Sequence, residues 1–492
     1  MRAGITFFVA GCLLILLSAV MVIPTVLDFA DGQTAAGTAF GISALMTGFS
    51  GALLFLTFYN RYEKLSVREM YLTTSIVWVV ACAFAALPFY FAPVPMDYTD
   101  AFFEAMSGLT TMGATVIRDY SLFSRGILLW RGILQWIGGL GIIVIALGVL
   151  PLLRIGGMQL FSMESSDKSG KKMPKTSQII ATMMVIYIAF TAACILCLSF
   201  SGLSPFEAVA YSLATVSTGG FAPRASSAAD LSFTAQWVLV FFMFISGLPL
   251  LLSYSVLKKD WKQIKADMQI KTYIVFTIAA ALGLTVWLLA THPEMTVSRA
   301  LTDMTFSIVT VLTSTGFAVC DLESFGVFAV MFFTFLMPVG ACSGSTSGGI
   351  KLFRFNIIYL FSVQYLRHKL LPHGVFIAKY NGRPLTEEIT SGVFVFLAIF
   401  LMSAMISMLV LAALGLDFVT VFTGVISALG NAGLAFGSVI GAQGSFANLP
   451  DAAKWILSAD MMLGRLEYIT VFVILLPLAW RKEPKKVQVI DF

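Results

Sequence analysis

The sequence predicts an all-α integral membrane protein in which two N-terminal transmembrane helices precede four similar units around one axis, each a span, a re-entrant loop and a second span. The first supporting observation is composition: 58% of the 492 residues are hydrophobic and 12% are charged, against about 25% charged in a typical soluble domain. The second is a mean hydropathy of +0.90, spread over apolar segments that reach the roughly 20 residues a bilayer-spanning helix needs. The third is a short pattern that occurs four times, in which a half-length apolar segment runs into a polar triplet and a glycine.

Two spans precede the repeated units, within residues 1–66. They cover about Ile5–Val26 and Ala39–Tyr59. The first run is long enough to span, and no small-residue cleavage site follows it convincingly. We therefore expect a membrane helix there rather than a cleaved signal peptide.

Four units follow, at residues 67–165, 166–270, 271–385 and 386–492, and they bring the expected number of spans to ten. The segments expected in the first two units are Met70–Phe91, Tyr98–Leu109 and Ile127–Leu153, then Ile179–Phe200, Pro205–Ala214 and Trp237–Leu257. Those expected in the last two are Tyr273–Ala290, Ser298–Leu312 and a span from Phe325 past Phe353, then Ile389–Leu414, Phe418–Leu429 and Lys454–Trp480. The middle segment of each unit is too short to cross a hydrocarbon core about 30 Å thick at about 1.5 Å per residue. We expect it to dip into the membrane and return, which is tolerated where protein or a water-filled cavity surrounds the backbone.

The loops after the short segments have the composition of a cation site built from main-chain oxygens. They read Thr110-Thr111-Met112-Gly113, Val216-Ser217-Thr218-Gly219, Thr313-Ser314-Thr315-Gly316 and Gly430-Asn431-Ala432-Gly433. Each short helix would point its C-terminal end, with roughly half a negative elementary charge, at its loop. Glycine permits positive φ values and close approach of carbonyl groups, which replace the hydration shell of a bare cation. One such loop also fits simple helix packing by small residues, but four in the same context are a more specific signal.

Basic residues indicate the orientation. They concentrate in the connections at 61–68, 154–175, 258–271, 351–383 and 481–486, whereas the opposite connections hold only Arg118, Arg125, Arg224, Arg299 and Lys454. The positive-inside rule therefore places both termini in the cytoplasm and the four glycine loops toward the outside. The outward connections also carry carboxylates: Asp97, Asp100, Glu104, Asp119, Glu207, Asp230, Asp303, Asp321 and Glu323. Together they would concentrate cations at an outer mouth, although any single one is more simply a solvated loop charge.

The second span of the third unit is interrupted between Met337 and Gly349 by a run rich in glycine and serine. Proline removes a helix donor and this density of glycine does not hold a helix. A plain connecting loop is the alternative, but the preceding apolar segment, 326–336, is too short to cross alone, and the spacing is not that of a phosphate-binding loop. We expect an unwound segment that lines the cavity below the glycine loops and blocks the ion path at rest, with these gating residues: Gly340, Cys342, Gly344, Ser345, Gly348 and Gly349.

Arg465 lies within the last expected span. An arginine at mid-membrane costs about 2.5–3.5 kcal/mol on insertion scales and normally faces a cavity or a partner. From the residues alone, a structural ion pair with Asp460 or Glu467 and a role in the ion path have equal weight.

With these loops, the chain resembles the Trk/Ktr/HKT superfamily of potassium-translocating membrane subunits, over nearly its whole length. The two extra N-terminal spans are similar to the bacterial Trk type rather than the shorter Ktr type. The resemblance implies a pseudo-fourfold pore within one subunit, a homodimer of such subunits, and a cytoplasmic regulatory ring that binds nucleotides of the NAD, ATP or ADP type. It also favours the ion-path role for Arg465, as a positive charge beneath the filter that limits conduction.

Carried over residue by residue, the resemblance makes Gly113, Gly219, Gly316 and Gly433 the selectivity glycines. The wider set of implied potassium-binding filter residues is Thr110, Thr111, Met112, Gly113, Ser217, Thr218, Gly219, Gly220, Ser314, Thr315, Gly316, Phe317, Asn431, Ala432 and Gly433. Gly113 favours potassium, because a serine accompanies sodium preference at this position in some plant relatives. Met112 departs from the threonine expected in the first loop.

The expected function is potassium uptake across the bacterial inner (plasma) membrane, gated by the intramembrane segment and a cytoplasmic partner, with K⁺ as substrate ion and no covalently bound cofactor. The alternative is a secondary potassium symporter coupled to protons or sodium, a class in which inverted repeats with broken helices are common. Here the four units share one topology instead. The chain has no metalloprotease or nucleophile-elbow motif, so we expect no enzyme, and its basic stretches 168–175 and 258–271 indicate contact with membrane lipids or a partner ring rather than nucleic acid.

Overall fold

The computed structural model describes residues 3–59, 67–94, 96–148, 176–250, 252, 266–441 and 445–475. This part of the chain is predominantly helical, as predicted, with one two-stranded antiparallel hairpin, β1 (Lys379–Tyr380) and β2 (Arg383–Pro384). Six of its helical segments are long and apolar enough to cross a membrane. They are Gly4–Ala30, Thr34–Phe58, Glu69–Tyr90, Ile180–Phe200, Met268–Thr291 and Glu387–Ala413.

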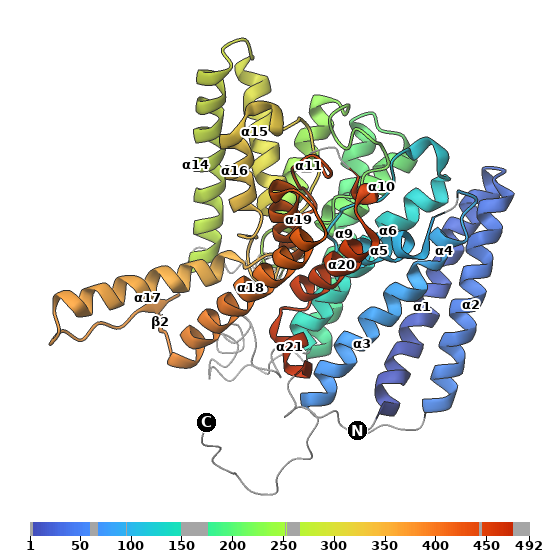
Figure 1. Cartoon of the computed structure of the whole chain (residues 1–492), viewed down its shortest axis with the longest axis horizontal. Coiled ribbons are helices and arrows are strands. Elements are labelled where there is room, and N and C mark those ends of the chain that lie inside the picture. The colour runs from blue at the N-terminus through green and yellow to red at the C-terminus, as the bar shows by residue number, and fades with distance from the viewer. Residues whose placement is uncertain are drawn as a thin grey trace, which may run out of the picture.

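The first two helices, α1 (Ala3–Ala30) and α2 (Thr34–Phe58), pack along each other at one edge of the molecule (Figure 1). Small residues allow the close approach: a Cβ atom on Gly11 would lie 2.7 Å from the Phe55 nitrogen, and small residues at helix interfaces are typical of membrane proteins. The Asp28 carboxylate at the end of α1 accepts hydrogen bonds from the Gly126 amide and the Ser124 hydroxyl, at 2.8 and 2.9 Å. The pair is thereby attached to the start of α6.

The remaining helices follow the predicted order. The first and second sets are α3 (Val67–Ala85), α4 (Leu87–Tyr90), α5 (Tyr98–Leu109) and α6 (Arg125–Gly148), then α9 (Thr176–Phe200), α10 (Pro205–Val216) and α11 (Phe233–Ser246). The third and fourth are α14 (Met268–Thr291), α15 (Val297–Leu312), α16 (Val327–Leu336) and α17 (Leu352–Leu370), then α18 (Glu387–Ala413), α19 (Phe418–Gly430), α20 (Asp451–Arg465) and α21 (Ile469–Leu475). Three short 3-10 turns, η1 (Tyr120–Leu122), η2 (Glu323–Phe325) and η3 (Phe446–Asn448), lie in connections.

The four short helices α5, α10, α15 and α19 begin and end within two residues of the expected segments. Local sequence explains three of the starts, because Ser204, Thr296 and Asp417 each accept a hydrogen bond from a backbone amide of the first turn. Ser204 and Glu207 form a full capping box. Such caps satisfy otherwise unpaired amides and contribute about 0.5–2 kcal/mol each.

Two of the expected continuous spans are wrong. The span expected at Trp237–Leu257 ends as a helix at Ser246, because Gly247 and Pro249 follow and proline has no amide to donate. The span expected at Lys454–Trp480 is broken after Arg465, where Glu467 and Tyr468 have φ values of 58° and 25°.

Several expected segments fall partly outside the described residues: 149–153, residues 251 and 253–257 of the span expected at Trp237–Leu257, the basic stretch 168–175, residues 258–265 of the second basic stretch, and 476–480. In the third set the helix is interrupted as predicted, since residues 337–351 contain no regular helix. Figure 1 shows α17 leaving the helical body steeply inclined to α14, with the β1–β2 hairpin connecting it to α18.

Candidate functional site

The loops after α5, α10, α15 and α19 share one backbone conformation. One residue of each loop lies in the left-handed region, with φ between 51° and 55°: Thr111, Thr218, Ser314 and Asn431. Two residues later each loop has a glycine with φ between 78° and 89°: Gly113, Gly220, Gly316 and Gly433. Four segments about 100 residues apart in sequence therefore repeat the same turn.

Each turn is a Schellman motif that ends its helix. In the first loop the Met112 amide donates to the Ser107 carbonyl at 2.9 Å and the Thr111 amide donates to Gly108 at 3.0 Å. The same pair of bonds occurs in the other three loops. The motif usually has glycine at the left-handed position, and a residue with a Cβ atom costs about 1–2 kcal/mol there. Surrounding contacts must hold these four residues in place, which is typical of functional sites.

The second loop differs from its prediction by one residue. Gly219 was expected to match Gly113, but Gly220 has the positive φ value, and Gly219 matches Met112 in its hydrogen bonds. The reason is that α10 continues to Val216, so the triplet before the glycine is Ser217-Thr218-Gly219 rather than Val216-Ser217-Thr218.

The four loops meet in a closed ring. At each positive-φ glycine, a Cβ atom would lie closer than 3 Å to a carbonyl oxygen of a neighbouring loop. The four contacts are Gly113 with the carbonyl of Gly219, Gly220 with that of Thr315, Gly316 with that of Ala432, and Gly433 with that of Met112. Each loop thus touches the next, and the fourth touches the first. Only glycine permits this approach, both because of the φ value and because of the lack of space.

Side chains of the predicted site residues pack around the ring. The hydroxyls of Thr110 and Ser217 donate to helix carbonyls four residues earlier, each at 2.7 Å. Phe317 is fully buried against the Tyr211 ring, with centroids 5.7 Å apart, so it is a packing residue of the loop. The Asn431 amide donates to the Met461 carbonyl at 3.1 Å. The hydroxyls of Thr110 and Ser217 thus have helix partners, whereas the Asn431 amide oxygen is buried without a hydrogen bond. Main-chain carbonyls line the contacts between loops.

The 337–351 segment lies against three of the four loops. The Thr218 hydroxyl donates to that of Thr346 at 3.2 Å, and the hydroxyls of Ser314 and Ser347 are 3.3 Å apart. A Cβ atom on Gly348 would lie 3.0 Å from that of Asn431. All three contacts involve the left-handed residue of a loop. The segment therefore covers one side of the ring.

Hydrogen bonds give the 337–351 segment a defined shape. Its two ends pair, because the Ile350 and Lys351 amides donate to the Pro338 and Val339 carbonyls, each at 2.8 Å. The middle is attached to the end of α11, where the Cys342 amide donates to Gly247 and the Leu250 amide to Gly344. Gly340, Gly344 and Gly349 have φ values of 69°, 80° and 79°, and the Ser345 hydroxyl donates to the Cys342 carbonyl.

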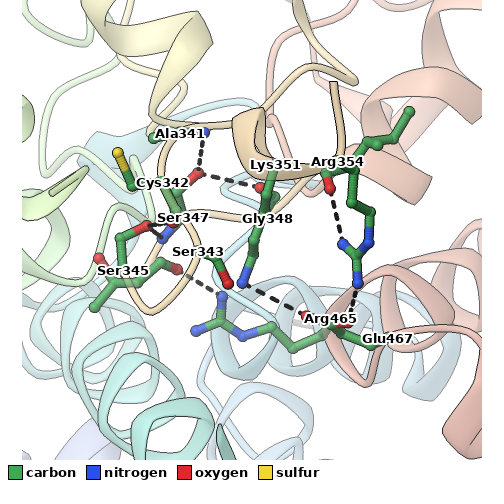
Figure 2. Close-up of polar contacts among 12 residues, drawn as sticks. Ala341, Cys342, Ser343, Ser345, Ser347, Gly348, Lys351, Arg354, Arg465 and Glu467 are labelled. Atoms are coloured by element: carbon green, nitrogen blue, oxygen red, sulfur yellow. Dashed lines mark hydrogen bonds and ion pairs between the residues drawn. The ribbon is translucent and has the colours of Figure 1, made fainter. Parts of the chain in front are cut away.

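Arg465 contacts the 337–351 segment, and its guanidinium lies close to the segment in Figure 2. Its two terminal nitrogens donate to the Thr346 carbonyl at 2.9 Å and the Gly138 carbonyl at 3.0 Å. The predicted alternative of an ion pair with Asp460 or Glu467 is wrong. Glu467 pairs with Arg354 and Lys351, and the residues for which side chains are described place no carboxylate on the Arg465 guanidinium.

Several of the carboxylates predicted to face outward are already paired. Four ion pairs account for them: Asp100 with Lys454, Glu104 with Arg131, Glu207 with Arg224, and Asp303 with Arg299. Asp119 remains exposed, and hydrogen bonds from the Ser121 hydroxyl and amide hold its pKa below the ordinary aspartate value. The expected concentration of free negative charge is therefore reduced, because one basic residue neutralises each of the four paired carboxylates.

Among the described residues, no three His, Cys, Asp or Glu side chains gather as a metal cluster. The family model for TrkH, described as a cation transport protein, matches residues 37–479. The chain belongs to the TrkH family. It is 37% identical over 477 residues to the Trk system potassium uptake protein TrkI of Halomonas elongata, covering 96% of both chains. It is 34% identical over 487 residues to the Trk system potassium uptake protein TrkH of Escherichia coli K12, covering 96% of this chain and 98% of that one.

Among solved structures, the crystal structure of the potassium transporter TrkH from Vibrio parahaemolyticus superposes with a TM-score of 0.89 at 29% identity. The match covers 98% of this chain and 100% of that one. The same helical fold therefore extends over nearly the full length of both proteins.

Sequence reasoning missed two polar residues of this TrkH-family chain, Arg131 and Gln135 on α6. Arg131 is buried and bonded to Glu104, and Gln135 is buried against loop residues Gly219 and Phe221. Both stand in the apolar segment expected as the span Ile127–Leu153. Polar side chains inside such a segment are a signal for a functional or structural partner, and this signal was available in the sequence.

Proposed function

We propose that this chain takes up potassium ions across the bacterial inner membrane through a filter made of main-chain carbonyl oxygens from the four loops. The observation that carries the proposal is the closed ring of contacts between Gly113, Gly220, Gly316 and Gly433 and the carbonyl groups of their neighbours. A ring of backbone carbonyls replaces the hydration shell of a potassium ion. The relatives from Halomonas elongata and Escherichia coli K12, both named as potassium uptake proteins, support the choice of ion.

The electrostatics of the ring suit a cation that binds there and must then be released. Four helix C-termini end at the ring, and each carries roughly half a negative elementary charge. This charge attracts a cation without a carboxylate that would bind it too tightly for rapid exit. Glu104, the nearest outward carboxylate in the first set, is neutralised by Arg131 at 2.7 Å.

We propose that the 337–351 segment closes the ion path at rest. Its contacts with Thr218, Ser314 and Asn431 support this, because an ion leaving the ring on that side would meet the segment. Arg465 adds a positive charge next to Thr346. Opening would require the segment to move away from the ring and the Thr346–Arg465 contact to break.

The orientation and the partners complete the proposal. The loops would face outward and both termini the cytoplasm, following the positive-inside rule. The chain would act as a homodimer controlled by a cytoplasmic nucleotide-binding ring. The control would be exerted on the 337–351 segment, the element that we propose as the gate.

The test is cation selectivity of the purified full chain in liposomes. Serine at Gly113, Gly220, Gly316 or Gly433 should lower the ratio of potassium to sodium flux, because the added side chain overlaps the neighbouring loop. Gly392→Ser in α18 is the matched control, since nothing lies within 4 Å of a Cβ atom there. Wild-type selectivity in all four ring variants would refute the filter.

The same preparation separates a pore from a coupled transporter. A pore gives a flux that reverses at the potassium equilibrium potential, whatever the proton and sodium gradients. A reversal potential that shifts with either gradient would contradict the pore and favour symport.

A further inference from the structure

Two side chains of α6 hold the backbone of the second loop. The Gln135 amide nitrogen donates to the Gly219 carbonyl at 2.5 Å, and its amide oxygen accepts from the Phe221 amide at 3.0 Å. Arg131, one helical turn earlier, donates to the Ala222 carbonyl at 3.0 Å. Residues four apart lie on the same helix face, so one face of α6 bonds three backbone groups of this loop: the Gly219 carbonyl, the Phe221 amide and the Ala222 carbonyl.

The Gly219 carbonyl is one of the four at which neighbouring loops touch. The equivalent carbonyls belong to Met112, Thr315 and Ala432. Within the described part of the chain, no side chain donates a hydrogen bond to those three carbonyls. Gln135 therefore makes the second loop different from the others. Its presence also explains the double glycine. Gly220 is needed for the ring, and Gly219 is needed because a Cβ atom there would lie 2.6 Å from the Gln135 oxygen.

The corresponding positions on α11 and α20 carry methionine. Gly139 on α6 and Gly247, the residue after α11, face equivalent groups: in each case a Cβ atom would meet a tyrosine hydroxyl and the residue that follows a short helix. Gly138 on α6 and Gly464 on α20 each face the carbonyl of a leucine near the end of a short helix, Leu109 or Leu429. Counting back from these glycines, Gln135 corresponds to Met243 and Met461, both fully buried. Methionine has no hydrogen to donate to a carbonyl.

We propose that Gln135 is a positioning residue that sets cation selectivity by fixing the Gly219 carbonyl at the contact between the first and second loops. This inference rests on the proposed filter. With both amide atoms bonded, rotation of the 219–221 backbone is restrained, and so is the distance from Gly219 to Gly113. Without the amide, the loop can adjust to a smaller or larger ion, and the number and field strength of carbonyl groups around the ion change.

The test replaces Gln135 with the residue found at the matching positions. Gln135→Met should lower the potassium-to-sodium flux ratio in liposomes by about threefold to tenfold, the range that corresponds to a net hydrogen bond. Gln135→Glu keeps the acceptor for Phe221 but places a carboxylate oxygen against the Gly219 carbonyl, so it should lower the ratio further. We expect potassium to raise the melting temperature of the detergent-purified wild-type chain more than sodium does. This difference should be smaller in both variants.

Gln236→Met is the matched control. Gln236 is also a buried glutamine, on α11, but its amide donates to the Ala228 and Ala229 carbonyls, away from the ring. We expect it to leave the flux ratio unchanged. A folded Gln135→Met chain with wild-type selectivity would overturn the inference, as would an equal change in Gln236→Met or the failure of both Gln135 variants to fold.

The outcomes separate this inference from the filter itself. If the ring glycine variants lose selectivity and the Gln135 variants do not, the filter stands and the inference fails. If the ring glycine variants keep wild-type selectivity, the proposed filter is refuted, and the inference about Gln135 is refuted with it.

Discussion

Replacing Arg465 by alanine should increase potassium flux. The guanidinium joins the Thr346 carbonyl of the 337–351 segment to the Gly138 carbonyl of α6, at 2.9 and 3.0 Å. If the segment leaves the ring on opening while Arg465 stays on α20, the contact with Thr346 is lost in the open state. The arginine therefore stabilises the closed state by one charge-assisted hydrogen bond.

The size of the effect follows from that single contact. A hydrogen bond to a charged group contributes about 1.5–3 kcal/mol, so its removal should shift the closed-to-open ratio by about tenfold to a hundredfold. The flux should rise by the same factor while the open fraction remains small. Removing the positive charge acts in the same direction, because the charge lies next to the path that we propose.

The assay is rubidium or potassium uptake into liposomes that contain the purified chain. Arg465→Lys separates the two contributions, since lysine keeps the charge but does not present two nitrogens in a fixed planar geometry. An intermediate flux in Arg465→Lys indicates that the hydrogen bond contributes to keeping the path closed. A wild-type flux indicates that the positive charge alone is sufficient. A folded Arg465→Ala chain with wild-type or lower flux would refute the reasoning.

Three further predictions concern the gate, the buried ion pair and the N-terminal helices. Deleting 342–346 should raise the flux, because it removes Thr346, which contacts both Thr218 of the ring and Arg465; unchanged or lower flux in correctly inserted protein would count against the gate. Glu104→Ala should lower the free energy of unfolding by about 3–5 kcal/mol, because it leaves Arg131 buried and unpaired. In thermal unfolding, the double variant Glu104→Ala/Arg131→Met should lose less stability than the sum of the losses in the two single variants. Losses of stability that simply add would contradict this. A Cβ atom on Gly51 of α2 would lie 2.9 Å from the Ile15 nitrogen of α1, so Gly51→Leu should separate the two helices and lower the melting temperature. Gly283→Leu, with nothing within 4 Å of its Cβ position, should not. Equal stability of the two variants would disprove the close packing.

The short helices could be predicted from the sequence almost to the residue. Their limits are local: an apolar run of half-membrane length, a capping residue such as Ser204 or Asp417 at the start, and a glycine-containing turn at the end. The interruption after Leu336 was equally clear, because proline and repeated glycine act on the backbone where they stand.

The parts that sequence reasoning missed depend on contacts between distant segments. The choice between Gly219 and Gly220 depends on where α10 ends, at Val216 rather than Ala214, and on which glycine meets the Thr315 carbonyl of the third loop. The break after Arg465 has the same origin, since the Tyr468 hydroxyl donates to the Leu429 carbonyl at 2.7 Å. Composition alone suggested an uninterrupted span there.

Arg465 is recognisable as unusual from the sequence, and of its two interpretations the ion pair is the wrong one. Carboxylates nearby in sequence, Asp460 and Glu467, suggested an ion pair. In the structure, Glu467 pairs with Arg354 instead, and the Ser407 hydroxyl donates a hydrogen bond to the Asp460 carboxylate at 2.8 Å. Main-chain carbonyls as partners of an arginine leave no trace in the sequence, because every residue has one.

Locating the ion tests the account most directly. Crystals or grids of the full chain prepared in rubidium should show ion density enclosed by the four loops, between Gly113, Gly220, Gly316 and Gly433, and this density should disappear when sodium replaces rubidium. Rubidium bound elsewhere in the protein, with the ring empty, would contradict the account.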